Sequence, residues 1–494
     1  MAGTKNIILL MTDQLRLDYV SFHGKGKLHT PNIDRIAEGV GFTRCVSVNP
    51  ICTPARCALL TGKYTHQIGM LSMSGDLSLQ HPTYAQALQK AGYYTAGIGK
   101  FHWLQGWPFS TKRGQGHDLV GLKEEIRRYG FDTVWEVAGK QLAQKNYCDY
   151  CHYLADKGLL EHYRDFVQAY GKNEKMAEKQ QFIGKPSPLP EEDYVDIVIG
   201  DHIVKQIESR PADRPFFIFG SFVSPHPPYD PPQSYLDRVA YEETDDFIPD
   251  GPQMLSHEAK QRLYSLRQAY KAMILLIDDQ IGRILAKLEE EQLLDDTVIL
   301  FTSDHGEMMG DHMRVAKQLP YWQSATVPTA IRHPDYLQGQ VTDTPVELID
   351  LTATILDIAG LDPKQALSKA WPAYHSVVPA RSLLPIMTGE QERIRPYAFS
   401  ESDGPGGRWQ MVQNEACKYV RYLNYEWSEG GEGSGPVELF FDLVTDPQEE
   451  TNRIGDPDYA AEIARCRSYR EYILDTTPPA QQRWAPVLDP TQTL

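Results

Sequence analysis

The chain lacks a long apolar run and is short of positive charge. No stretch reaches the roughly 18 apolar residues of a membrane-spanning helix, which argues against a membrane-embedded protein. Among 494 residues there are 49 Lys and Arg against 66 Asp and Glu, a formal net charge of −17. So acidic a protein is not expected to bind nucleic acid or an anionic membrane through its general surface. If the substrate is an anion, its attraction must come from a local cluster of cations or from a metal.

The sequence also lacks a regular cysteine framework. Its seven cysteines are odd in number and irregularly spaced, which does not indicate a set of disulfides. Cys148 and Cys151 form a lone CxxC without the second pair that a zinc site needs, so we expect a structural role for them. The first apolar run, residues 7–11, is shorter than a signal h-region and no small-residue cleavage site follows it. We therefore expect a cytoplasmic protein, or a mature form whose signal has been removed.

The pattern of apolar residues predicts an α/β fold. An apolar content of 41% and a charged content of 23% are ordinary for a globular protein. Short continuous apolar runs, typical of strands covered on both faces, alternate with helical periodicity. The expected strands are 6–11, 93–98, 215–219 and 297–301, and the expected helices are 82–91, 193–208 and 257–291. This alternation favours a large, mainly parallel sheet flanked by helices.

Two stretches depart from that alternation. Residues from about 105 to 190 are rich in Gly, Lys, Tyr and Glu and show no clean strand, so we interpret them as an insertion over the site. After about residue 372, strand-like pieces at 418–423 and 437–443 are joined by a Gly-rich loop at 429–435. We predict a catalytic domain at 1–371 that carries the insertion, and a smaller C-terminal α+β domain at 372–494.

Reactive side chains follow the predicted strands. Asp13, Lys100, His226, Asp304 and His305 each lie just past the C-terminal end of one of them. In an open α/β sheet, ligands bind in the crevice at that edge. The sequence therefore predicts that these five side chains converge on one site.

Several motifs together resemble the sulfatase family. Residues 52–62 (CTPARCALLTG) are similar to its signature, C-x-P-[S/A]-R with T-G four residues later. Residues 99–102 (GKFH), 303–307 (SDHGE), and 310–312 (GDH) with Lys317 match further family segments, as does 438–452. The matches run in the family's order over nearly the whole chain. The resemblance implies an alkaline-phosphatase-like fold and a sulfuric ester hydrolase close to arylsulfatases and phosphonate monoester hydrolases.

The resemblance also assigns the chemistry. It implies that Cys52 is oxidised to formylglycine, whose hydrated aldehyde attacks sulfur and later expels sulfate, a form of covalent catalysis. Arg56 and His102 resemble residues that orient the two hydroxyls of that nucleophile. The lysines Lys100 and Lys317 resemble ligands of the sulfate oxygens. His226 resembles a substrate-binding general acid for the leaving alcohol.

A single divalent cation is implied beside this nucleophile. Asp13 and Asp304 would supply carboxylates, Gln14 and His305 would be co-ligands, and the modified Cys52 would complete the set. Oxygen ligands suit Ca²⁺, Mg²⁺ or Mn²⁺, and an imidazole nitrogen favours Mn²⁺. On family grounds we expect Ca²⁺, with Mn²⁺ or Mg²⁺ as alternatives.

Two other functions remain open. Many sulfatases have a second Asp where Gln14 stands, whereas phosphonate monoester hydrolases and choline sulfatases share the Asp-Gln pair, so a phosphonate monoester or phosphodiester hydrolase is the first alternative. Against it, Lys100 and His102 preserve the sulfatase-type G-K-x-H. If Cys52 stays unmodified, the chain would be a non-catalytic anion-binding protein. The expected partners are a small anionic ester and a formylglycine-generating or equivalent enzyme, with no nucleic acid or membrane; a homo-oligomer is left open.

Overall fold

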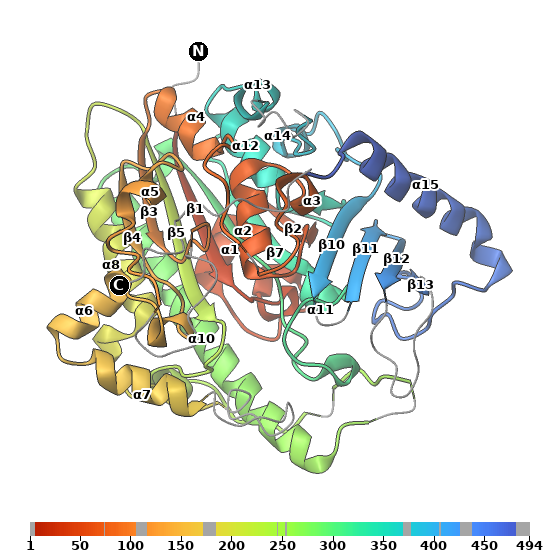
Figure 1. Ribbon diagram of the computed structural model, residues 1–494, viewed down its shortest axis with the longest axis horizontal. Coiled ribbons are helices and arrows are strands. Elements are labelled where there is room, and N and C mark those ends of the chain that lie inside the picture. The colour runs from red at the N-terminus through yellow and green to blue at the C-terminus, as the bar shows by residue number, and fades with distance from the viewer. Residues whose placement is uncertain are drawn as a thin grey trace.

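One large sheet occupies the centre of the molecule (Figure 1). The computed structural model describes residues 5–73, 75–104, 116–170, 184–244, 246–251, 254–368, 377–404, 407–424 and 437–480. The nine strands of the large sheet run in the order β4-β3-β5-β1-β6-β7-β2-β8, and β9 also pairs with β2. Their bounds are β1 Asn6–Asp13, β2 Val40–Val46, β3 Tyr94–Gly99, β4 Thr133–Glu136, β5 Phe216–Pro225, β6 Thr297–Ser303, β7 Thr326–Arg332, β8 Gln340–Thr342 and β9 Val346–Glu347.

Alternating side chains of the central strand divide the core into two layers. Along β1, Ile7 and Leu9 join one buried cluster, and Ile8 and Leu10 join the other. Successive strand residues point to opposite faces, so a strand that is apolar throughout must be covered on both sides. The first cluster lies under α2 (Cys52–Thr61), α4 (Tyr84–Lys90) and α12 (Asp350–Ile358), and the second under α1 (Pro31–Ala37), α8 (Val195–Glu208) and α10 (His257–Glu290).

The predicted elements of this layer architecture are confirmed. The four expected strands are β1, β3, β5 and β6, and the three expected helices are α4, α8 and α10. Every pairing in the large sheet is parallel except those of β7, which runs antiparallel to both β6 and β2. Further helices among the described residues are α3 Thr65–Ile68, α5 Lys123–Arg127, α6 Asp149–Asp156, α7 Leu160–Tyr170, α9 Gln233–Leu236, α11 Trp322–Ala325, α13 Pro363–Leu367 and α14 Leu384–Met387.

The segment 105–190 contributes to the sheet, contrary to expectation. Within it, β4 pairs in parallel with β3 at the sheet edge, so the prediction that this segment has no strand is wrong. The reason is physical: β4 has only four residues and is half-exposed along much of its length, so it carries no continuous apolar run. Helices α6 and α7 bury Tyr150 and Tyr163 in the second cluster. Residues 105–115 and 171–183 lie outside the described residues.

A smaller antiparallel sheet follows in the C-terminal part, with strand order β10-β11-β12-β13. The strands predicted at 418–423 and 437–443 are β12 and β13, whereas the whole of the Gly-rich loop at 429–435 and the predicted boundary at 371/372 lie outside the described residues. The division into two domains stays a prediction. The bounds are β10 Ala398–Gly404, β11 Gly407–Gln413, β12 Cys417–Asn424 and β13 Val437–Asp442, with α15 Ala460–Thr476 packed against β11 and β12.

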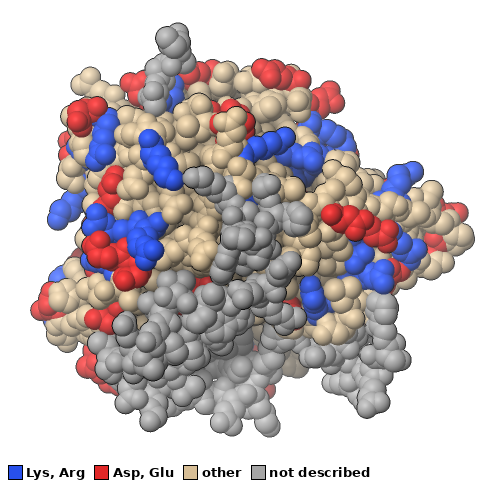
Figure 2. Space-filling model, turned by 45° about the horizontal axis from the view of Figure 1, so that its top comes forward, with Lys and Arg blue, Asp and Glu red and all other residues tan. Residues whose placement is uncertain are grey.

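Charges of both signs share the molecular surface. On the face drawn in Figure 2, the described Lys and Arg side chains lie among Asp and Glu side chains. Among the described residues, no helix combines the length and the apolar character needed to cross a membrane.

Candidate active site

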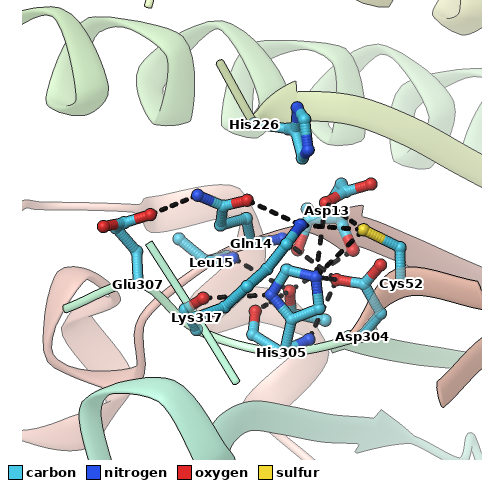
Figure 3. Close-up of polar contacts among 12 residues, drawn as sticks. Asp13, Gln14, Leu15, Cys52, His226, Asp304, His305, Glu307 and Lys317 are labelled. Atoms are coloured by element: carbon cyan, nitrogen blue, oxygen red, sulfur yellow. Dashed lines mark hydrogen bonds and ion pairs between the residues drawn. The ribbon is translucent and has the colours of Figure 1, made fainter. Parts of the chain in front are cut away.

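Four adjacent strands deliver the predicted side chains to one edge of the sheet. Asp13 ends β1, and Lys100, His226 and Asp304 follow the ends of β3, β5 and β6. Because these strands are parallel neighbours, their carboxyl ends meet at the same edge. Lys100 Nζ forms a very short contact with Asp13 Oδ2, and His305 Nε2 lies 3.7 Å from Asp13 Oδ1. Figure 3 shows Asp13, His226, Asp304 and His305 grouped around Cys52.

Cys52 lies at the centre of this group, in the first turn of the ten-residue helix α2. Its side chain is buried, with Sγ 2.8 Å from Lys317 Nζ and 3.2 Å from His305 Nε2. Burial raises the pKa of the Cys52 thiol, but Lys317, Lys100 and His305 together hold it well below the ordinary value. A helix N-terminus also favours negative charge. The site is thus built to stabilise an anionic atom on residue 52.

Four ligating atoms converge beside this position. Asp13, Cys52, Asp304 and His305 each offer one atom, and these atoms lie within 4.8 Å of one another. His305 Nδ1 donates to the Gly306 carbonyl at 3.0 Å, which leaves the lone pair of Nε2 directed at the group. This is the usual arrangement of a metal-ligating histidine. The donor set therefore fits a divalent cation.

Gln14 adds an amide to this group. Its backbone is left-handed, with φ of 72°, and its N–H donates to Asp304 Oδ1 at 3.0 Å. Its side-chain Oε1 accepts from Lys317 Nζ at 3.0 Å. The carbonyl oxygen of Gln14 therefore faces the same space as the carboxylates.

The guanidinium of Arg56 holds the carboxylates of Asp13 and Asp304 in place. Its guanidinium donates to Asp304 Oδ2 at 2.8 Å and to Asp13 Oδ2 at 3.3 Å, and all three side chains are fully buried. The same group donates to the Lys100 carbonyl at 2.6 Å and to Ser221 Oγ at 2.7 Å. The resemblance assigned Arg56 to orienting the nucleophile; these bonds show it holding the two carboxylates and the Lys100 backbone.

Burial and nearby cations decide the protonation of the carboxylate Asp13. Burial and the Cys52 sulfur raise its pKa, but the cations Lys100 and Arg56 outweigh them and hold it well below the ordinary value. Asp13 is therefore ionised at neutral pH, as a metal ligand must be.

Two histidines flank the nucleophile in neutral form. His102 Nε2 donates to the Ala138 carbonyl at 3.0 Å, so Nδ1 is an acceptor, and burial together with Lys100 lowers its pKa to about 4. His226 Nδ1 donates to the Pro227 carbonyl at 2.8 Å, which makes Nε2 the acceptor of the neutral ring. Burial and Lys317 lower the pKa of His226, against the opposing effect of Asp13.

The sequence profile of the family described as Sulfatase matches residues 5–361, most of the chain. This chain belongs to the sulfatase family. It is therefore a hydrolase, and the family's divalent metal and formylglycine apply to it in general terms.

Relatives of this sulfatase match over nearly its full length. The arylsulfatase of Clostridium perfringens is 28% identical, covering 94% of this chain and 92% of the relative. The N-acetylglucosamine-6-O-sulfatase of Bacteroides thetaiotaomicron is 26% identical, covering 92% of this chain and 83% of the relative. The crystal structure of the phosphonate monoester hydrolase of Agrobacterium radiobacter superimposes with a TM-score of 0.72 at 23% identity and 95% coverage of both chains, which shows the shared fold.

The sequence reasoning missed two further residues of this sulfatase's site. Glu307 is fully buried and accepts hydrogen bonds from the side chains of Gln14 and Tyr229. Glu307 stands inside the recognised segment 303–307, where its position after Gly306 was the only signal. Tyr229 stands in the proline-rich run after His226, where nothing in the sequence marks it.

Proposed function

We propose that the protein hydrolyses a sulfate monoester with a formylglycine nucleophile made from Cys52 and one divalent cation held by Asp13, Gln14, Asp304 and His305. The observation that carries this proposal is the position of Cys52 Sγ. It lies among ligating atoms on one side and Lys317 Nζ, at 2.8 Å, on the other. A nucleophile, a metal site and a cation for the ester are thereby brought to one point.

Residue 52 and the cation would supply the covalent step. Formylglycine at residue 52 would provide a hydrated aldehyde whose hydroxyl displaces the alcohol from sulfur, and a cation held by the proposed ligands would lower the pKa of that hydroxyl and offset the charge of the ester. Conversion of Cys52 requires a maturation enzyme, which is the partner we propose besides the anionic ester itself.

The chain's own cations bind and orient the ester. Lys317 is partly exposed and lies next to residue 52, so its ammonium is placed to bind a sulfate oxygen. Lys100 pairs with Asp13 on the other side and is placed to share that role. Fixed cations in a buried site stabilise developing negative charge at little reorganisation cost. His102 Nδ1 is an acceptor, so we assign His102 to orienting the hydroxyl of residue 52 through a hydrogen bond.

We propose that His226 donates a proton to the leaving alcohol through Nε2. Burial and Lys317 lower the pKa of His226, so this role requires that the bound anionic ester favour the imidazolium ring. Figure 3 places His226 across the site from His305 and Asp304, at the end of β5.

For the cation, we propose Ca²⁺. Carboxylate and amide oxygens from Asp13, Asp304 and Gln14 are hard ligands. The nitrogen of His305 makes Mn²⁺ the alternative, and Mg²⁺ would also suit the oxygens.

A phosphonate monoester hydrolase is the second candidate, favoured by the neutral amide of Gln14 at the metal site. Aryl sulfate and aryl phosphonate monoester assays on one preparation separate the two. We expect the higher kcat/KM for the sulfate, and a higher value for the phosphonate would reverse the assignment. Intact mass on the same sample reports the state of Cys52; an unmodified thiol with no turnover would indicate an anion-binding protein. A panel of sulfated sugars, choline sulfate and aryl sulfates then identifies the leaving alcohol.

A further inference from the structure

A single buried carboxylate joins three segments of the site. Glu307 has no exposed surface and lies two residues after the proposed metal ligand His305, just past the end of β6. Its Oε2 accepts from Gln14 Nε2 in a very short contact and from Tyr229 OH at 3.2 Å. Its Oε1 accepts from the backbone N–H of Met309 at 3.2 Å and, more closely, from that of Ala316. A carboxylate has enough lone pairs to accept all four hydrogen bonds at once.

The bond to Gln14 decides which way its amide points. An amide carries an acceptor on one side and two donors on the other, so the two orientations offer opposite chemistry. Only the NH₂ group can donate to Glu307, so Oε1 must point the other way, toward Lys317. In the reversed orientation, N–H groups of Gln14 would face the cation and could not bind it.

The bonds to the backbone hold the segment that ends at Lys317. Met309, His312, Met313 and Ala316 all have left-handed φ angles, between 51° and 70°. Such angles are strained in a residue with a side chain and persist where the surroundings impose them. Glu307 accepts from Met309 and Ala316, on either side of this stretch.

We propose that Glu307 is a positioning residue, which presents the Gln14 carbonyl oxygen to the metal and holds Lys317 beside residue 52. The inference rests on the proposed function, because it requires a cation at this site. The proposal explains how the neutral amide of Gln14 can act as a ligand at a position where many sulfatases have a second Asp. The negative charge is carried by Glu307, which contacts the amide instead of the cation. Tyr229 ties the same carboxylate to the segment that follows His226.

The test is a charge-conserving swap. Glu307→Gln leaves two facing amides, so the Gln14 orientation is no longer enforced. Gln14→Glu combined with Glu307→Gln reverses the pair: the new amide at 307 donates to the new carboxylate at 14. The buried charge is the same as in the wild type, which keeps the swap informative if Glu307→Gln does not fold. The readout is the dissociation constant of Ca²⁺ and of Mn²⁺, measured by calorimetry on full-length protein stripped with a chelator.

We expect Glu307→Gln to weaken cation binding about 10–100-fold, the usual effect of losing a group that orients a metal ligand. In the Gln14→Glu background, the same substitution should be neutral or strengthen binding, because it replaces two facing carboxylates with a hydrogen-bonded pair. Glu347→Gln is the matched control: Glu347 is an equally buried carboxylate bound to Tyr64 and Arg395, and its loss should leave both dissociation constants unchanged.

Three outcomes overturn the inference. Unchanged cation binding in Glu307→Gln would do so directly. Equal weakening in both backgrounds would show that Glu307 acts only as part of the packing. Failure of the wild-type protein to bind either cation would overturn the proposed function, and the inference with it; the wild-type measurement thus separates the two failures.

Discussion

Two clusters of buried charge can be compared in this molecule, one at the proposed active site and one outside it. The reactive cluster comprises Asp13, Cys52, Arg56, Lys100, Asp304, His305 and Lys317. The Arg395 cluster comprises Tyr64, Glu347, Asp350 and Arg395, at β9 and the start of α12. Both hold carboxylates with no exposed surface next to an arginine.

The clusters differ in where their lone pairs point. In the Arg395 cluster, the guanidinium lies between two carboxylates, 2.6 Å from Glu347 Oε2. The other oxygens accept from protein donors: Glu347 Oε1 from the backbone N–H of Phe399, and Asp350 Oδ2 from the backbone N–H of Glu347, each at 2.8 Å. In the reactive cluster, four ligating atoms instead face a common point. The carboxylates of the Arg395 cluster are therefore satisfied by protein donors, whereas the ligating atoms of the reactive cluster lie close enough together to share a cation.

Removal of the nucleophile gives the largest expected difference between the clusters. Cys52→Ala deletes covalent catalysis, so turnover of an aryl sulfate should fall by several orders of magnitude. The melting temperature should stay close to that of the wild type, because the small side chain is replaced without loss of a backbone partner. Appreciable turnover in this variant would refute the assignment of Cys52.

Removal of the metal tests whether the convergent atoms hold a cation. Chelation should abolish activity, and added Ca²⁺ or Mn²⁺ should restore it, because Asp13 and Asp304 are the charged ligands. The metal content of the stripped protein is checked by elemental analysis. Normal turnover in verified metal-free protein would mean that the reactive cluster works without a cation.

Substitution of His226 should give a smaller and substrate-dependent loss. His226→Ala should slow alkyl or sugar sulfates about 10²–10⁴-fold, the usual contribution of a positioned acid. An ester of an acidic phenol should be slowed far less, because its leaving group departs as an anion. Equal losses for both substrate classes would make His226 a binding or structural residue instead.

The Arg395 cluster should respond in stability rather than in activity. Arg395→Leu leaves two buried carboxylates without their cation, which costs about 3–5 kcal/mol when one partner of a buried pair is removed. The free energy of unfolding, measured with urea, should fall by that amount. Cation affinity of the folded protein should not change, and a parallel loss of affinity would show that the two clusters are linked.

The smallest expected effect is a pH dependence in the same cluster. Burial, only partly offset by Arg395, raises the pKa of Glu347 from 4.5 to about 7. A carboxyl group whose pKa is raised by folding stabilises the folded protein at pH values below its unfolded-state pKa. This contribution is lost as the pH rises through the folded-state pKa of about 7. Unfolding free energies at pH 5 and pH 8 should thus differ less in Glu347→Gln than in the wild type, by on the order of 1 kcal/mol. An unchanged difference would assign the titration to another group.

The sequence predicted the sheet edge that carries the site well, because apolar runs mark where the strands end. Apolar runs located β1, β3, β5 and β6, and the residues just past them follow from the chain alone. It predicted the surroundings less well. β2 and β7, which carries Pro328, were not recognised, and β4 was too short and exposed to show a pattern.

The contacts of single side chains could not be predicted. The resemblance named Arg56, but not that its guanidinium would bind Asp13 and Asp304. Glu307 lay in a recognised motif, yet its role depends on the left-handed turn at Gln14 and on the fold of residues 309–316, which no local pattern encodes. The lowered pKa of His226 likewise depends on its burial near Lys317.

The first strand of the small C-terminal sheet contacts the segment before Cys52, which bears on when that residue can be modified. Ser400 Oγ donates to the Ser47 carbonyl at 2.7 Å and the Glu401 N–H donates to the Val48 carbonyl at 3.0 Å, so β10 holds the segment that leads to Cys52. The folded protein leaves the Cys52 side chain only 2% exposed. A ribosome that adds roughly 5–20 residues per second needs roughly 20–70 s to travel from Cys52 to β10. If a maturation enzyme modifies Cys52, as we propose, it would have to act before β10 holds this segment in the folded protein.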